Sequence, residues 1–133
     1  MRDLTIVDGV IRLLDDEFEA LVDEAVEGLP AEFQPYLDNV VVEVEDLPDR
    51  RTARQLGLKD RRGLLGLYHG VPLTGRSVEH SGRLPDRITI YKTNIEACCH
   101  SRRDVVEQVR KTVLHEVGHH FGLDEDDLES KGY

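Results

Sequence analysis

The sequence VVEQVRKTVLHEVGHHFG fills residues 105–122 and is the strongest structural signal in the chain. Its apolar residues recur every three or four positions and form one stripe on a helix. This stripe consists of Val105, Val106, Val109, Val113, Leu114 and Val117. Ser101 or Asp104 can cap the start of the helix, and Gly122 suits the left-handed residue that ends it. The pattern predicts a long helix whose apolar stripe faces the core.

The same helix carries the pattern H-E-x-x-H at residues 115–119. Residues four apart lie one turn apart on the same face of a helix, so the imidazoles of His115 and His119 can reach one ion. Zinc accepts neutral imidazole nitrogen, and catalytic zinc sites keep one position for water. In this motif the carboxylate of Glu116 reaches that water and takes its proton. The motif predicts two zinc ligands and a general base.

A third zinc ligand is expected just after the helix. Residues 115–125 read HEVGHHFGLDE, which fits the longer frame H-E-x-x-H-x-x-G-x-x-H at every defined position except the last. Glu125 occupies that last position, and a carboxylate oxygen is an acceptable zinc ligand. Gly122 lets the backbone turn sharply, so that a residue three positions later can fold back beneath the metal. Asp124 lies one place earlier and is the alternative ligand, although the frame favours Glu125.

An N-terminal helix and three strands are predicted in the rest of the chain. The helix begins near Asp15 or Asp16 and ends at Gly28 and Pro30. Its apolar face is Phe18, Leu21, Val22 and Ala25. Residues 31–37 are expected to add a short helical turn interrupted at Pro35. The predicted strands are Asn39–Glu45, Leu64–Tyr68 and Arg87–Tyr91, and the basic segment Arg50–Arg62 between them is predicted as a surface loop or short helix.

Composition and charge narrow the class of function. A chain of 133 residues fits a single domain covering residues 1–133. Its formal net charge of −10 disfavours nucleic acid and anionic membrane surfaces as partners. The N-terminus has no apolar run that would serve as a signal peptide or a membrane span, so a cytoplasmic location is expected. Cys98 and Cys99 are neighbours that cannot form a disulfide framework, and we expect half-buried residues at the end of a strand.

The segment from His115 to Glu125 resembles the minimal zincins, which are small bacterial zincin-like metallopeptidases related to the Asp-zincins. The Asp-zincin pattern is H-E-x-x-H-x-x-G-x-x-D, so Glu125 stands where that pattern has aspartate. The similarity extends upstream through LGLYHGVPL (65–73), with Arg76 and Ser77, and through PDRITIY (85–91). No methionine follows Met1, so the Met-turn of metzincins is absent, and Tyr68 or Tyr91 is the candidate floor of the site.

The resemblance implies a single α+β zincin-like domain and a metallopeptidase activity. A small mixed β-sheet would pack with the N-terminal helix and with a C-terminal active-site helix, and an edge strand would lie beside a shallow cleft. We therefore predict zinc-dependent hydrolysis of peptide bonds, with the ion on His115, His119 and Glu125 and with Glu116 as the base. The strand Arg87–Tyr91 is expected to pair with the substrate along a free edge.

A rival interpretation is a non-catalytic module that binds a peptide or protein on the same scaffold, with a structural metal or none. Peptide cleavage that depends on Glu116 would separate the two functions. The sequence identifies neither the substrate nor the oligomeric state.

Overall fold

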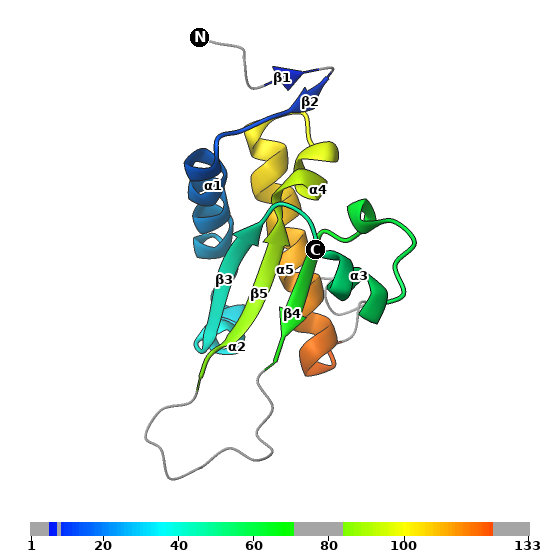
Figure 1. Cartoon of the computed structure of the whole chain (residues 1–133). Helices are drawn as coiled ribbons and strands as arrows, with labels where there is room; N and C mark the ends of the chain where they lie inside the picture. The colour runs from blue at the N-terminus through cyan, green and yellow to red at the C-terminus, as the bar shows by residue number, and fades with distance from the viewer. Residues whose placement is uncertain (1–5, 8, 71–83, 124–133) are drawn as a thin grey trace.

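The computed structural model describes residues 6–7, 9–70 and 84–123, and its helices and strands follow one another as Figure 1 shows. A small mixed sheet packs with helices, which confirms the predicted α+β class. The elements in chain order are β1 (Ile6–Val7), β2 (Val10–Ile11), α1 (Asp15–Glu27), η1 (Ala31–Phe33), α2 (Gln34–Leu37), β3 (Val40–Glu45), α3 (Arg50–Gln55), η2 (Arg61–Gly63), β4 (Gly66–His69), β5 (Asp86–Tyr91), α4 (Lys92–Ala97) and α5 (Arg102–Phe121).

The main sheet is mixed and has the strand order β3-β5-β4. β3 runs parallel to β5, with Val40 opposite Asp86, and β4 runs antiparallel to it, with Gly66 opposite Ile90. The predicted free edge on Arg87–Tyr91 is therefore wrong, because both sides of β5 are paired. The strand is buried almost throughout, which is typical of a central strand. Among the described strands of this sheet, β3 and β4 are the outer ones.

The two long helices confirm the sequence prediction and pack against each other behind the sheet (Figure 1). α1 begins at Asp15 and buries its predicted apolar face. α5 begins after Ser101, whose hydroxyl accepts a hydrogen bond from the Asp104 N–H at 3.0 Å. It ends at Gly122, where φ is 71°. The capping residues therefore place the H-E-x-x-H segment in the last turns of a well-defined helix.

The valine stripe of α5 forms the centre of the hydrophobic core, together with α1 and the inner side chains of β5. Fully buried members include Phe18, Ile88, Ile90, Val109 and Val113. Burying side chains of this size stabilises the fold by about 1.5–3 kcal/mol each. The core therefore fixes α5 against the sheet, and with it the position of the histidine pair relative to the strands.

The N-terminal hairpin β1–β2 and the short helix α4 were not predicted. The buried carboxylate of Glu96 in α4 accepts a hydrogen bond from the Leu13 N–H at 2.8 Å and lies 3.7 Å from the Lys92 ammonium. The predicted position of Cys98 and Cys99 at the end of a strand is wrong, because both residues follow α4. Both are free thiols, and only Cys99 is buried.

Two shorter segments also differ in detail from the expectation. Pro35 does not interrupt a helix, because it lies in the first turn of α2, where its missing N–H is not needed. The basic segment 50–62 contains α3, and the Asp49 carboxylate caps α3 by accepting the Thr52 N–H at 2.7 Å. None of the helices in the described ranges is long and apolar enough to cross a membrane.

Candidate metal centre

The paired imidazoles of His115 and His119 lie near the C-terminal end of α5. Their ring centroids are 5.9 Å apart, and the ring planes are inclined by 77°. A tetrahedral zinc ion about 2.0–2.1 Å from one nitrogen of each ring would place the two centroids roughly 5 Å apart. Both side chains line a pocket of about 360 Å³, whose lining also includes Leu64, Leu65 and Gly66. The spacing and the donor chemistry of the two residues fit a shared divalent ion.

The carboxylate of Glu116 lines the same pocket and is held by a backbone group of β4. Its Oε1 atom accepts a hydrogen bond from the Tyr68 N–H at 3.0 Å. Burial raises the pKa of Glu116, and this effect outweighs the opposing influence of the Tyr68 N–H and of the nearby His119, His115 and His69. A partly buried carboxyl with a raised pKa accepts protons more readily than an ordinary glutamate.

The alternation of hydrogen bonds in β4 explains why the Tyr68 N–H is available to Glu116. The Tyr91 N–H donates to the Leu65 carbonyl at 3.0 Å, so the backbone groups of Leu67 face β5 and those of Gly66 and Tyr68 face the open edge. The edge of β4 therefore presents its polar groups on the side where Glu116 lies.

Gly66 allows α5 to approach β4 closely enough for this contact. A Cβ atom at position 66 would lie 2.6 Å from the Thr112 Cγ2 atom and 3.2 Å from the Thr89 carbonyl oxygen. The first distance is shorter than any normal contact between carbon atoms. The missing side chain of Gly66 thus sets the distance between the strand and the helix at the level of Glu116.

A polar cluster beside this pocket was missed by the sequence analysis. The Tyr68 hydroxyl donates to the Asp86 Oδ2 atom at 2.7 Å, and the His120 ring stacks on the Tyr68 ring at a centroid distance of 3.9 Å. The His120 Nε2 atom is 3.9 Å from the same carboxylate oxygen. Tyr68 pairs with Ile88, so Asp86 is its diagonal neighbour across the two strands. Only knowledge of the strand register would have revealed this cluster.

The remaining site candidates are placed as follows. Tyr91, a suggested floor of the site, is buried in the sheet, and burial raises its pKa to about 12. Tyr68 contributes its backbone N–H to Glu116 and its side chain to Asp86. Glu125 and the alternative ligand Asp124 lie outside the described residues. Within the described ranges, no group of three or more His, Cys, Asp or Glu side chains is arranged to hold a metal ion.

Comparison with known proteins identifies the family. A family model described as zincin-like metallopeptidase matches residues 37–133, which is more than half of the chain. The chain belongs to this family. Membership of a zincin-like family implies zinc binding, which agrees with the chemistry of the paired imidazoles. The match includes β4, the whole of α5 and the residues after Gly122.

The fold of this zincin-like protein is also found in a solved structure. A conserved hypothetical protein from Thermus thermophilus is 26% identical, with a TM-score of 0.51. The similarity covers 89% of this chain and 99% of that one. No curated protein matches the chain. The chain and this structural relative therefore share a fold.

Proposed function

We propose that this protein is a zinc-dependent peptidase. The observation that supports the proposal is the contact of Glu116 with the edge of β4, in the same pocket as the two histidines. His115 and His119 would hold the ion together with a carboxylate after Gly122, either Glu125 or Asp124. When bound, zinc lowers the pKa of a coordinated water towards about 7 and polarises a substrate carbonyl.

Glu116 is proposed to move the proton. Its carboxylate takes one proton from the attacking water as the new carbon–oxygen bond forms, and it returns that proton to the leaving amine as the peptide bond breaks. The Tyr68 N–H keeps the Glu116 carboxylate directed at the pocket. The second proton of the water also ends on the amine, so the products are a carboxylate and an ammonium group and the base is regenerated in each cycle.

The edge of β4 is proposed to bind the substrate. Gly66 is buried beside Thr112 but lines the histidine pocket, and its backbone N–H and carbonyl point away from β5, which is the direction in which an extended peptide would add a strand. Leu64 and Leu65 provide apolar surface at the same wall of the pocket. This assignment replaces the predicted role of the Arg87–Tyr91 strand, whose two sides are already paired.

The test is cleavage of an unstructured peptide library by the wild type and by Glu116→Gln, with zinc supplied. We expect the variant to lose at least about a hundredfold in kcat/KM while retaining zinc, because it removes the base and leaves the imidazoles in place. Glu107→Gln, an exposed change on the same helix, is the matched control and should cleave normally. If the wild type and Glu116→Gln are equally inert across the library, the protein is a binding module on a zincin-like scaffold.

A further inference from the structure

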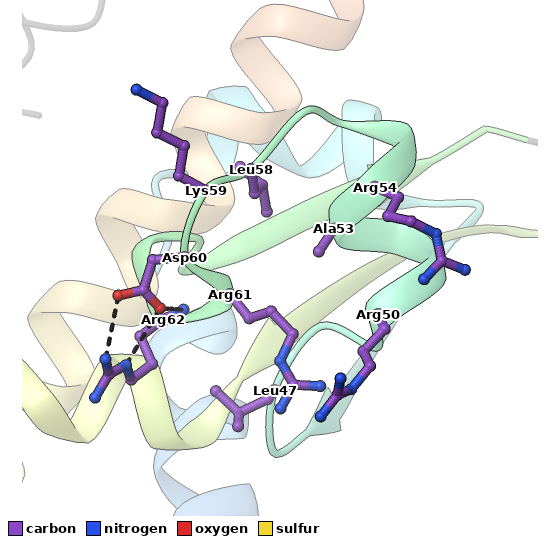
Figure 2. A pocket seen from close by; sticks show the side chains of 9 residues that line it. All are labelled: Leu47, Arg50, Ala53, Arg54, Leu58, Lys59, Asp60, Arg61 and Arg62. Carbon is purple, nitrogen blue, oxygen red and sulfur yellow. Dashed lines mark hydrogen bonds and ion pairs between the residues drawn. The ribbon is translucent and has the colours of Figure 1, made fainter.

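A second recess lies beside the turn that leads into β4, and its lining is strongly basic. It has a volume of about 460 Å³ and is formed by α3 and residues 58–62 (Figure 2). Its positively charged side chains include Arg50, Arg54, Lys59 and Arg61, while Leu47, Ala53 and Leu58 give it apolar walls. We call it the cationic recess.

Its charge contrasts with that of the whole molecule. Residues 50–62 hold six of the chain's 17 lysines and arginines but only one acidic residue, in a chain with a net charge of −10. A concentration of like charge is costly unless a counter-ion or ligand offsets it. The segment is therefore a local concentration of positive charge on an otherwise acidic molecule.

The acidic residue in the recess is already paired. The Asp60 carboxylate accepts hydrogen bonds from the Arg62 N–H at 2.9 Å and from the Arg62 guanidinium at 3.2 and 3.3 Å. In the part of the chain that the structure describes, Arg50, Arg54 and Arg61 form no ion pair. The Asp60 carboxylate lies in the field of Arg61, but its hydrogen bonds go to Arg62.

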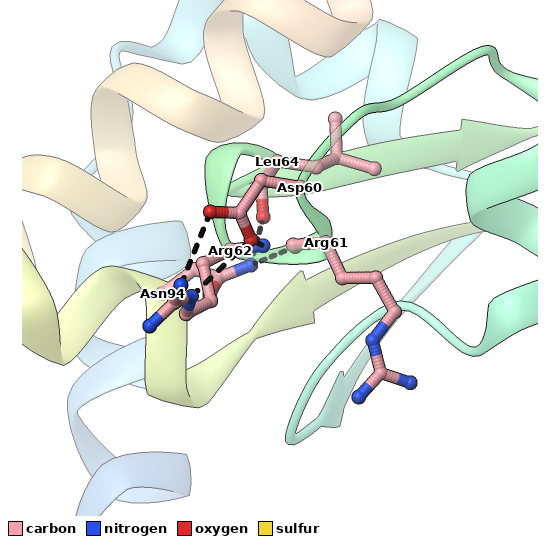
Figure 3. Close-up of polar contacts among 5 residues, drawn as sticks. All are labelled: Asp60, Arg61, Arg62, Leu64 and Asn94. Atoms are coloured by element: carbon pink, nitrogen blue, oxygen red, sulfur yellow. Dashed lines mark hydrogen bonds and ion pairs between the residues drawn. The ribbon is translucent and has the colours of Figure 1, made fainter.

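The turn that carries Arg61 is fixed from inside the protein. Asn94 in α4 is buried, and its Nδ2 atom donates to the Arg61 carbonyl at 2.9 Å and to the Leu64 carbonyl at 2.6 Å (Figure 3). Figures 2 and 3 both show the Arg61 side chain extending away from the Asp60–Arg62 pair. The backbone that positions the Arg61 guanidinium is thus held in place before any ligand arrives.

The same turn joins the cationic recess to the candidate metal centre. Leu64, whose carbonyl is held by Asn94, lines the histidine pocket and leads directly into Gly66 at the edge of β4. A peptide residue in extended conformation spans about 3.3 Å, so a strand bound along this edge would pass Leu64 within a few residues of the pocket. A substrate bound along this edge would therefore pass the turn that also carries Arg61 of the cationic recess.

We propose that the cationic recess binds acidic side chains of the peptide substrate, a few residues from the bond that is cut. The inference rests on the proposed peptidase function and adds a substrate class to it, namely peptides with aspartate or glutamate on one side of the scissile bond. Planar guanidinium groups bind carboxylates through two parallel hydrogen bonds. The apolar walls accommodate the methylene groups of those acidic side chains.

The experiment measures binding without turnover, in full-length Glu116→Gln protein. Two labelled peptides of equal length are compared by fluorescence anisotropy, one with glutamates flanking the central residues and one with glutamines in their place. We expect the glutamate peptide to bind at least about tenfold tighter at low salt, and the difference to shrink as sodium chloride rises from about 50 to 500 mM.

Adding Arg50→Gln, Arg54→Gln and Arg61→Gln together should abolish the preference. The matched control removes three positive charges elsewhere, with Arg12→Gln, Arg102→Gln and Arg103→Gln, and should retain the preference; all three of these arginines are exposed. Equal binding of the two peptides, or a preference that survives in the recess variant, would overturn the proposal. Recess-dependent binding of inorganic phosphate with no effect of the variant on either peptide would overturn it in favour of a phosphate ligand.

The outcome is distinguishable from a failure of the peptidase proposal. Cleavage of the glutamine peptide by the wild type tests hydrolysis independently of the recess. If neither peptide is cleaved but the recess-dependent preference is present, the peptidase proposal fails and the acidic-peptide site stands.

Discussion

A contact between Gly66 and Thr112 limits how closely α5, the helix of the histidine pair, approaches the sheet. The missing Cβ of Gly66 leaves room for the Thr112 methyl group, and the resulting contact between strand and helix brings the Glu116 carboxylate to the Tyr68 N–H. The Thr112 hydroxyl is occupied separately, since it donates to the Gln108 carbonyl at 2.8 Å. The methyl and the hydroxyl of Thr112 therefore have separable roles.

Gly66→Ala should lower the free energy of unfolding by about 1–3 kcal/mol, because the added methyl group overpacks the interface with α5. Thr112→Ser in the same chain should restore part of the loss, since it removes the clashing methyl group and keeps the hydroxyl. Urea unfolding of the two single variants and the double variant measures both effects. If the changes in unfolding free energy of the two single variants simply add in the double variant, the contact between positions 66 and 112 does not limit how closely α5 packs on β4.

The two neighbouring cysteines should differ sharply in reactivity. Burial raises the pKa of the Cys99 thiol to about 12, whereas Cys98 is exposed. The reactive form is the thiolate, so Cys99 in the native protein should be almost inert at neutral pH. Alkylation with iodoacetamide followed by mass spectrometry should label Cys98 first. Equal labelling rates in the folded protein would contradict the burial of Cys99.

The contact that holds Glu116 could not be predicted from the sequence, because it joins two distant parts of the chain. The pattern H-E-x-x-H is readable because both histidines and Glu116 lie within one helix. The partner of Glu116 is a backbone N–H in a strand 48 residues away. A backbone donor is present at every residue except proline, so no residue type indicates which one is used.

The short helix α4 links the N-terminal segment to the rest of the molecule. The Glu96 carboxylate accepts the Leu13 N–H just before α1 and lies beside the Lys92 ammonium. Nearly all of the Glu96 side chain is buried. This buried acceptor in a helix of six residues therefore adds to the packing of α1 on α5 by holding the backbone just before α1.

Replacing Glu96 by alanine should destabilise the protein by about 1–3 kcal/mol, because it leaves the buried Leu13 N–H and the Lys92 ammonium without their acceptor. Glu96→Gln is the matched control, since its amide oxygen can still accept the Leu13 N–H and it should cost less. Thermal unfolding monitored by circular dichroism compares the two. If alanine is no worse than glutamine, the Leu13 contact does not stabilise the N-terminal segment.

Elements with a long periodic pattern were predictable, and their arrangement was not. α1 and α5 each bury a regular apolar stripe and begin and end at recognisable residues, so their existence and most of their bounds follow from the sequence. The sequence correctly predicts β5 as a strand but wrongly predicts that one of its edges is free. Strand order depends on contacts between β3, β5 and β4 that no local pattern records.

At the scale of the whole molecule, metal binding should be coupled to pH. Both His115 and His119 must be neutral to bind zinc, so protons and zinc compete for their ring nitrogens. Zinc affinity should therefore fall as the pH is lowered from neutral to acidic values. Isothermal titration calorimetry at about pH 5, 6, 7 and 8 measures the trend. An affinity that stays constant over this interval would contradict ligation by two histidines.

The family and the fold class were predictable because three segments, 65–73, 85–91 and 115–125, resemble the minimal zincins, and the family model confirms the family over residues 37–133. The cationic recess was recognised in the sequence only as a basic surface segment. Asn94 holds the turn between Arg61 and Leu64 through two hydrogen bonds. It follows that turn by about thirty residues. Only the folded chain brings these segments together.

The zinc content per chain tests the proposed metal centre most directly. Elemental analysis is applied to the wild type, His115→Ala, His119→Ala, Glu125→Ala, Asp124→Ala and Glu116→Gln after dialysis against buffered zinc. We predict one zinc per chain in the wild type and in Glu116→Gln, a loss of zinc in both histidine variants, and weaker retention in Glu125→Ala than in Asp124→Ala. Full zinc retention in His115→Ala and His119→Ala, with the fold intact, would contradict the proposed metal centre.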